Sequence, residues 1–148
     1  MMTIKDRISS DIKAAMLAKD KELLSTLRLI AAAIKQVEVD ERIEVDDARM
    51  LIILDKMSKQ RKESIAQFEK ANRQDLVQQE QTELLVIGKY LPEPLSEAEV
   101  VALLDEAITA TSAQKMADMG KVMAYIKPKI QGRADLTQVS ALIKAKLS

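Results

Sequence analysis

Apolar residues recur every three or four positions along most of this chain, and no segment alternates apolar and polar residues convincingly. The first spacing places apolar side chains on one face of an α-helix, whereas alternation would place them on one face of a β-strand. Aromatic residues make up only 2% of the 148 residues, so aliphatic side chains and methionine must build the core. Such a core favours helices packed on helices over a β-sandwich, whose strands are rich in aromatic and β-branched residues. The sequence therefore predicts an all-α fold.

Capping residues divide the N-terminal part of the chain into four predicted helices. Thr3 opens the first helix, and Asp20 caps the second after a tight hairpin turn. Residues 39–46 are read as a polar connection, Asp46 caps the third helix, and Asn72 ends it in the left-handed conformation. The predicted inward-facing residues of the first helix are Ile4, Ile8, Ile12, Ala15 and Met16.

One charged residue interrupts the apolar stripe of the third predicted helix. Arg61 follows Met57 and precedes Ile65 on the core line of that helix. A buried cation needs a partner, so we expect Arg61 to pair with Glu80 or Glu83 of the next helix. This pair would be structural before it was functional.

Two prolines mark the boundary between two predicted domains. Pro92 and Pro94 cannot continue the fourth helix, so it ends near Tyr90. We therefore expect an N-terminal helical domain at residues 1–92 and a small three-helix domain at residues 95–148. The predicted features of the second domain are a cap at Ser96, a loop at residues 109–115, a cap at Asp118, a kink or helix end at Pro128, a turn at Gly132 and a cap at Asp135.

Composition excludes several kinds of chemistry. The chain has no cysteine and no histidine, which removes thiolate catalysis, the commonest general base and the commonest metal ligand. Serines are present, but nothing in the sequence marks a Ser–Lys pair, a glycine-rich phosphate loop or an ATP-binding motif. We therefore expect no catalytic residues, no cofactor and no metal, and a chain that is not an enzyme on its own.

No apolar run approaches the ~20 residues of a membrane span, and the first residues lack the apolar stretch of a signal peptide. These observations predict a protein without a membrane partner. The cytoplasm is its expected location.

The C-terminal part of the chain carries a local excess of positive charge. Residues 115–148 contain seven basic and two acidic residues, a net charge of +5, in a chain whose formal net charge is 0. Two of the three glycines also lie in this segment. A positive excess of this kind favours an anionic partner.

Gly120 falls in the first turn of the predicted sixth helix, where backbone N–H groups lack helical partners and carry partial positive charge. A glycine there lets a phosphate or another backbone approach, and Lys121 adds a full charge. The alternative is a tight crossing of short helices, in which glycine saves space. Lys127, Lys129 and Arg133 complete the candidate nucleic-acid-binding set in this segment, and Arg133 is the freer neighbour of the predicted cap at Asp135.

A second group of basic residues lies on the third predicted helix and directly after it. Lys59, Lys62 and Lys70 lie largely off its apolar stripe and would form a basic ridge along a phosphate backbone. Lys59, Lys62 and Arg73 are the candidate binding residues of this segment. The alternative is an ordinary solvated helix face, with Glu63 and Glu69 in weak ion pairs.

Several motifs carry a resemblance to a known family. They are Lys59-Gln60-Arg61-Lys62 with Ser64-Ile65, Ala71-Asn72-Arg73 with Asp75-Leu76, Tyr90-Leu91-Pro92 with Leu95-Ser96, Asp118-Met119-Gly120-Lys121-Val122-Met123 and Gly132-Arg133-Ala134-Asp135. In their order and spacing the chain resembles the bacterial YqeY proteins along nearly its full length. Its last third also resembles the tail domain of GatB, a subunit of the glutamine-dependent amidotransferase that corrects misacylated tRNA. The chain departs from the family pattern at Asn72 and Leu136, where glycine is expected.

The resemblance implies an all-helical N-terminal bundle, a three-helix C-terminal domain and a tail that contacts tRNA. It would also imply carbon–nitrogen ligase activity with glutamine as amido-N-donor. In the amidotransferase, however, glutamine hydrolysis belongs to another subunit and tRNA activation to the body of GatB, and neither set of residues has a counterpart here.

Three functional hypotheses follow. The first is a non-catalytic module that binds tRNA, or a tRNA–enzyme complex, through its basic C-terminal domain. The second is an accessory component of a glutamine-dependent tRNA amidotransferase, with amidotransferase or aminoacyl-tRNA synthetase proteins as partners. The third is a protein-interaction module whose exposed surface would comprise Met116, Met119, Met123 and Tyr125, although core positions are the favoured interpretation of these residues.

Overall fold

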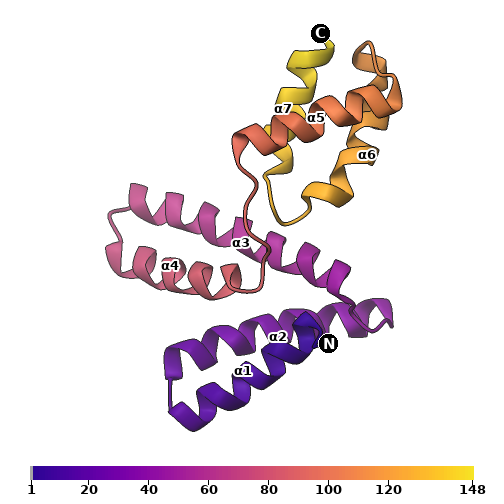
Figure 1. Ribbon diagram of the computed structural model, residues 1–148. Helices are drawn as coiled ribbons and strands as arrows, with labels where there is room; N and C mark the ends of the chain where they lie inside the picture. Colours follow the sequence, from indigo (N-terminus) through magenta and orange to yellow (C-terminus); the bar gives the residue numbers. More distant parts are fainter. Residues whose placement is uncertain (1) are drawn as a thin grey trace. The chain divides into compact units, whose positions relative to one another are not determined.

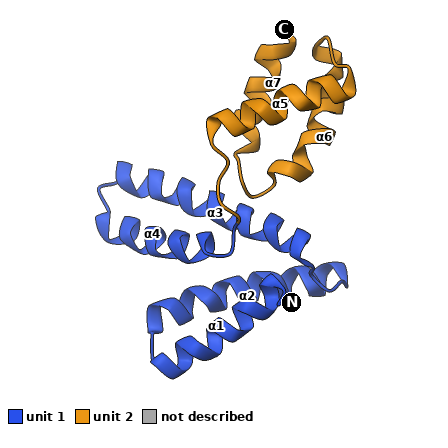
Figure 2. Ribbon diagram, in the orientation of Figure 1, with its two compact units in different colours: residues 1–91 blue, residues 92–148 orange. Residues whose placement is uncertain are grey.

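The computed structural model describes residues 2–148, and the structural statements below refer to these residues. They form seven α-helices and one short 3₁₀ turn, without a β-strand (Figure 1). The elements are α1 (Ile4–Ala18), α2 (Lys21–Glu41), α3 (Asp47–Lys70), α4 (Gln74–Gly88), α5 (Glu97–Thr111), η1 (Met116–Asp118), α6 (Met119–Ile130) and α7 (Leu136–Leu147). The predicted all-α fold is confirmed. The chain divides into two compact units, residues 1–91 and residues 92–148 (Figure 2).

Unit 1 is built from two helical hairpins, α1 with α2 and α3 with α4 (Figure 1). Three predicted caps begin its first three helices. Thr3 accepts a hydrogen bond from the backbone N–H of residue 6 at 3.1 Å, Asp20 from that of residue 23 at 3.2 Å, and Asp46 from that of residue 49 at 2.9 Å. Asn72 has a φ of 56°, the predicted left-handed conformation that ends α3.

The second helix is longer than the sequence predicts. Residues 39–41 belong to α2 rather than to a polar connection, so that part of the prediction is wrong. A glutamate near the end of α2 makes tertiary contacts that the local sequence does not reveal. Glu38 accepts hydrogen bonds from the ammonium of Lys5 at 2.7 Å and from the backbone N–H of Val45 at 3.0 Å. These two bonds tie the last turns of α2 to the start of α1 and to the segment before α3.

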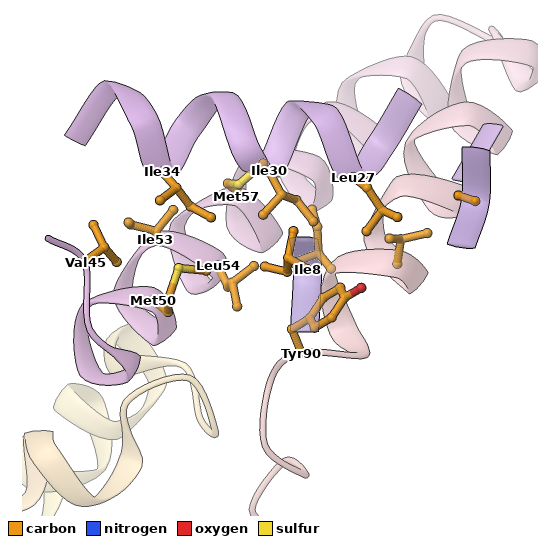
Figure 3. Packing of buried hydrophobic residues seen from close by; sticks show 13 residues of the cluster. Ile8, Leu27, Ile30, Ile34, Val45, Met50, Ile53, Leu54, Met57 and Tyr90 are labelled. Carbon is orange, nitrogen blue, oxygen red and sulfur yellow. The ribbon is translucent and has the colours of Figure 1, made fainter. Parts of the chain in front are cut away.

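Aliphatic side chains fill the core of unit 1, and Figure 3 shows those of α2 pointing toward those of α3. Leu27, Ile30, Met50 and Leu54 are fully buried there. Tyr90 adds the single aromatic ring of this cluster. The buried residues of the cluster are Ile8, Ala15, Leu27, Ile30, Ile34, Val45, Met50, Ile53, Leu54, Met57, Val86, Ile87 and Tyr90. Met16 was predicted to face inward but is 53% exposed, because α1 ends two residues later at the hairpin turn.

Polar contacts also hold unit 1 together. The hydroxyl of Tyr90 donates to the carboxylate of Asp11, and the guanidinium of Arg7 lies over the tyrosine ring, 5.3 Å from its centre. Arg61 donates from Nη2 to Oε1 of Glu83 at 3.4 Å, with the two side chains only 16% and 11% exposed. The expected pairing of Arg61 with a glutamate of the next helix is therefore confirmed, with Glu83 as the partner.

Unit 2 is a small three-helix domain formed by α5, α6 and α7, with its own aliphatic core. Leu104, Ala107, Val122, Ile126, Ile130 and Ile143 are fully buried in it. Asp135 caps α7 by accepting from the backbone N–H of Thr137 at 2.9 Å, as predicted. Gly132 has a φ of 76°, which confirms the predicted turn and explains why glycine stands there.

Two helix ends in unit 2 differ from the prediction. The expected loop at residues 109–115 is partly helical, because α5 continues to Thr111. Of the two outcomes predicted for Pro128, a kink or a helix end, the helix end is wrong, because α6 runs on to Ile130. A proline lacks the backbone N–H and crowds the preceding turn, but burial of Ile126 and Ile130 on one helix face outweighs this cost.

None of the helices between residues 2 and 148 is both long and apolar enough to cross a membrane.

Candidate nucleic-acid interface

The exposed face of α6 carries three of the candidate residues. Gly120, Lys121 and Lys127 are exposed, whereas Val122 and Ile126 on the opposite side of the helix are fully buried. The helical period explains this division, because residues three to four positions apart share a face. The face therefore offers two ammonium groups beside a position that has no side chain.

Gly120 faces open space. A Cβ atom placed on it would have no heavy atom within 4 Å. The interpretation of this glycine as a space-saving residue in a tight helix crossing is therefore wrong. The open space leaves room for a molecule outside the chain to approach the backbone.

The expected cap of α6 is wrong. Asp118 makes no capping hydrogen bond to α6 and instead accepts from the backbone N–H groups of Gln114 at 3.0 Å and Lys115 at 3.3 Å. These two bonds lower the pKa of Asp118. The reason is that the helical backbone starts one turn earlier, in the 3₁₀ turn η1. Gly120 lies in the first turn of α6, as predicted, but the 3₁₀ turn η1 directly precedes that turn, so we do not base anion binding on a free helix N-terminus.

Lys121 and Lys127 are the cations of this face. Lys121 is 69% exposed, with its ammonium 3.9 Å from Oδ1 of Asp118, a distance that gives little attraction in water. Lys127 is exposed and has no ion-pair partner within residues 2–148. Its place in the last turn of α6 also complements the negative end of the helix. Both ammonium groups can meet a phosphate without first breaking a strong bond.

Lys129 is exposed, but contacts within unit 2 restrain its side chain. Its ammonium lies 3.3 Å from the hydroxyl of Tyr125 and 3.3 Å from Oε1 of Glu106, and 4.5 Å from the centre of the tyrosine ring. The tyrosine hydroxyl itself donates to Glu106 at 2.9 Å. The hydrogen bonds from Tyr125 and then Lys129 lower the pKa of Glu106. A phosphate that recruited Lys129 would have to compete with this carboxylate.

Arg133 is not the free residue that the sequence suggested. Its Nε donates to the backbone oxygen of Glu93 at 3.0 Å, and its own backbone oxygen accepts from the N–H of Leu95 at 2.8 Å. These two contacts hold the segment before α5 against the turn before α7. Arg133 is half-buried, so its first role is structural.

The charge excess of the tail is largely neutralised within unit 2. Residues 92–148 contain seven basic and seven acidic residues, because four of the acidic ones lie on α5. One of them, Asp105, pairs with Lys146 at 2.6 Å. The positive excess of residues 115–148 is thus offset by the acidic residues of α5, which packs against α6. What remains is a local positive face on α6 instead of a uniformly basic domain.

The three candidates of unit 1 are less available than their sequence spacing indicates. Lys59 lies 3.9 Å from Asp55 on the same helix. Arg73 donates to both oxygens of Asp75, from Nε at 3.2 Å and from Nη2 at 3.0 Å. Lys62 is exposed on α3. The alternative of a solvated helix face with ion pairs therefore fits Lys59, although its partner is an aspartate rather than an expected glutamate. Arg73 lies between α3 and α4 and is likewise paired with an aspartate.

The methionine surface considered for protein binding is mostly core. Met119, Met123 and Tyr125 pack against the buried cluster of unit 2, and Met116 is 43% exposed. This arrangement supports the core interpretation and leaves one exposed methionine in place of a patch.

Comparison with known proteins confirms the resemblance to the YqeY proteins. A profile of the family described as Yqey-like protein matches residues 5–147. Similar relatives include the protein named "Altered inheritance of mitochondria protein 41, mitochondrial" of Lachancea thermotolerans, which is 33% identical over 92% of this chain and 76% of its own length. The protein of the same name from Pyrenophora tritici-repentis is 32% identical over 86% of this chain and 71% of its own length. The protein of the same name from Saccharomyces cerevisiae strain YJM789 is 32% identical over 80% of this chain and 68% of its own length.

Proposed function

This chain belongs to the family of Yqey-like proteins, and on that premise we propose that it is a non-catalytic helical module that binds tRNA or a tRNA–enzyme complex. The contact surface is the exposed face of α6, which comprises Gly120, Lys121 and Lys127. Lys129 and Arg133 stand at its edge, and their present partners restrain them.

One observation carries the proposal. Two exposed ammonium groups, neither in a strong ion pair, flank a glycine that faces open space. A surface lysine contributes to phosphate binding through charge and counterion release, and a neighbouring glycine lets the sugar–phosphate backbone approach the helix closely. If both lysines contact phosphate, removing Lys121 or Lys127 should lower the affinity for RNA by similar amounts.

The aromatic residues support recognition by phosphate rather than by base stacking. Tyr90 is buried in the core of unit 1, and the ring of Tyr125 is covered by Lys129. Base stacking on an aromatic platform contributes about 1–3 kcal/mol per base. Neither tyrosine offers such a platform, and the third aromatic residue, Phe68, is half-buried on α3 and lies outside the α6 face. Binding should therefore depend strongly on salt and weakly on sequence.

A filter-binding titration with bulk tRNA at low and moderate salt tests the proposal. The variant Lys121→Glu/Lys127→Glu should lose binding, because it reverses both charges of the α6 face. Lys35→Glu is the matched control, since Lys35 is an exposed lysine of α2 outside the candidate set. Wild-type protein that fails to bind tRNA at low salt would contradict the proposal, as would equal affinity of the double variant and the control.

Gly120 gives an independent test of close approach. Gly120→Ala and Gly120→Leu should both fold, because a Cβ meets no atom within 4 Å. If the RNA backbone lies against this position, the leucine variant binds more weakly than the alanine variant while its charge is unchanged. Equal binding by both variants would show that the lysines act without a close approach at Gly120.

An accessory role in a glutamine-dependent tRNA amidotransferase is the alternative proposal, and the resemblance to the GatB tail supports it by analogy. Its assay adds this chain to glutamine, ATP and misacylated tRNA, with and without amidotransferase subunits. Stimulation of the complete enzyme would favour the accessory role, whereas activity of the chain alone would overturn the non-catalytic assignment.

The location proposed for this chain is the cytoplasm, whereas the relatives above have names that refer to mitochondria. Phosphate recognition by lysine is the same in either compartment. Detection of the protein in fractionated cells of its source tests the location separately from RNA binding.

A further inference from the structure

A tyrosine, a lysine and a glutamate form one hydrogen-bonded cluster at the edge of α6. The hydroxyl of Tyr125 donates to Oε1 of Glu106 at 2.9 Å, and the ammonium of Lys129 donates to the same oxygen at 3.3 Å. Glu106 comes from α5, which packs against α6. Two donors of α6 therefore converge on one anionic oxygen of another helix.

The two donors form an anion position that does not require a carboxylate. A hydroxyl and an ammonium donate to a phosphate oxygen as they donate to a carboxylate oxygen. The ammonium of Lys129 also lies 3.3 Å from the hydroxyl oxygen of Tyr125 and 4.5 Å from the centre of its ring, so these side chains contact each other independently of Glu106. Oε1 of Glu106 thus marks where a phosphate oxygen would be bound.

The anion position lies in line with a cation of the proposed RNA-binding face. Lys121, Tyr125 and Lys129 follow one another at intervals of four residues, so they share one ridge of α6. With a rise of about 1.5 Å per residue, the two lysines are about 12 Å apart along the helix axis. An RNA strand with one phosphate at Lys121 can therefore present a further phosphate to Tyr125 and Lys129.

The carboxylate of Glu106 is charged but weakly held. Hydrogen bonds from Tyr125 and then from Lys129 lower its pKa, so it is ionised at neutral pH. The side chains of Lys129 and Glu106 are 41% and 52% exposed, and ion pairs at this exposure contribute little to stability. Such a carboxylate competes for the two donors, and a polyanion can displace it.

We propose that Glu106 is a built-in competitor of RNA: in the free protein its carboxylate occupies the anion position of Tyr125 and Lys129, and a phosphate of the bound RNA displaces it. This inference rests on the proposed function, because it concerns the same helix and the same ligand. It adds two residues to those that set RNA affinity, Tyr125 as a donor to phosphate and Glu106 as the competitor of that phosphate.

The test is a double-mutant cycle measured by filter binding of bulk tRNA at low salt. Glu106→Gln keeps the shape of the side chain and removes its charge, so it should raise the affinity about two- to fivefold, the range that an exposed ion pair allows. Asp105→Asn is the matched control, because it removes the neighbouring charge of α5 but releases Lys146 of α7 instead. The control should gain less.

The cycle identifies the side chains that Glu106 restrains. In a Lys129→Gln background, Glu106→Gln should gain no more than the Asp105→Asn control, because no ammonium remains to be released. In a Glu106→Gln background, Tyr125→Phe should weaken binding severalfold, since the phosphate loses one hydrogen-bond donor. The inference is overturned if Glu106→Gln gains no more than the control, if its full gain persists without Lys129, or if Tyr125→Phe changes nothing.

The outcomes separate this inference from the proposed function. If the wild type binds tRNA but Glu106→Gln has no advantage over the control, the competitor role is wrong and the proposed function stands. If neither the wild type nor Glu106→Gln binds tRNA at low salt, the proposed function is wrong as well. Inorganic phosphate exchanged for chloride at constant ionic strength should not displace tRNA from Glu106→Gln, because a single ion cannot also contact Lys121. Displacement would assign the position to a small anion and overturn the assignment to RNA.

Discussion

The Arg61–Glu83 pair makes a quantitative prediction about the stability of unit 1. Its side chains are 16% and 11% exposed, so the pair lies between a surface ion pair and a fully buried one. Removing one partner of a buried pair costs about 3–5 kcal/mol, whereas exposed pairs contribute about 0–1 kcal/mol. The residual exposure and the 3.4 Å separation place the expected cost of Arg61→Met, or of Glu83→Met, at about 2 kcal/mol.

The double variant Arg61→Met/Glu83→Met should be more stable than either single variant, within about 1 kcal/mol of the wild type, because no uncompensated charge is left in the interior. The assay is chemical denaturation, with the fluorescence of Tyr90 reporting on unit 1 in a Tyr125→Phe background. A single variant within about 0.5 kcal/mol of the wild type would show that the pair behaves as a surface pair. If the double variant loses as much unfolding free energy as the two single variants together, the reasoning from burial is refuted.

Gly120→Ala should stabilise unit 2 by about 0.5 kcal/mol in thermal unfolding, because the position is helical and unobstructed, whereas Gly132→Ala should destabilise it by about 1 kcal/mol at its φ of 76°. Effects of the same sign would contradict this contrast. Ser96→Ala should cost about 1 kcal/mol, since Ser96 caps α5; an unchanged unfolding midpoint would count against that cap. The hydrogen bond from Lys5, followed by one from the backbone, lowers the pKa of Glu38 below its ordinary value of 4.5. Its contribution is therefore present above that value and is lost as the pH falls through the folded pKa, so Glu38→Gln should destabilise at pH 7 but not at pH 2 in urea titrations.

The sequence predicts where helices begin better than where they end. Thr3, Asp20 and Asp46 each cap a helix through a bond to the residue three positions ahead, and such local chemistry is visible in one short segment. The ends of α2 and α6 depend on tertiary contacts. Glu38 anchors the last turns of α2, and burial of Ile130 extends α6 past a proline. These contacts join distant segments and have no local signal.

The same distinction applies to the candidate site. The exposure of Lys121 and Lys127 follows from helical periodicity and was predictable. The restraint of Lys129 was not, because its partner Glu106 lies 23 positions away, and the partner of Arg133 lies 40 positions away.

The salt dependence of tRNA binding tests the central proposal most directly. Each phosphate contact contributes about one unit to the slope of log affinity against log salt concentration. If the α6 face contacts phosphate, Lys121→Gln/Lys127→Gln should lower the magnitude of this slope by about two units relative to the wild type, while Lys35→Gln should leave it unchanged. A double variant with the wild-type slope would contradict a phosphate contact at the exposed face of α6.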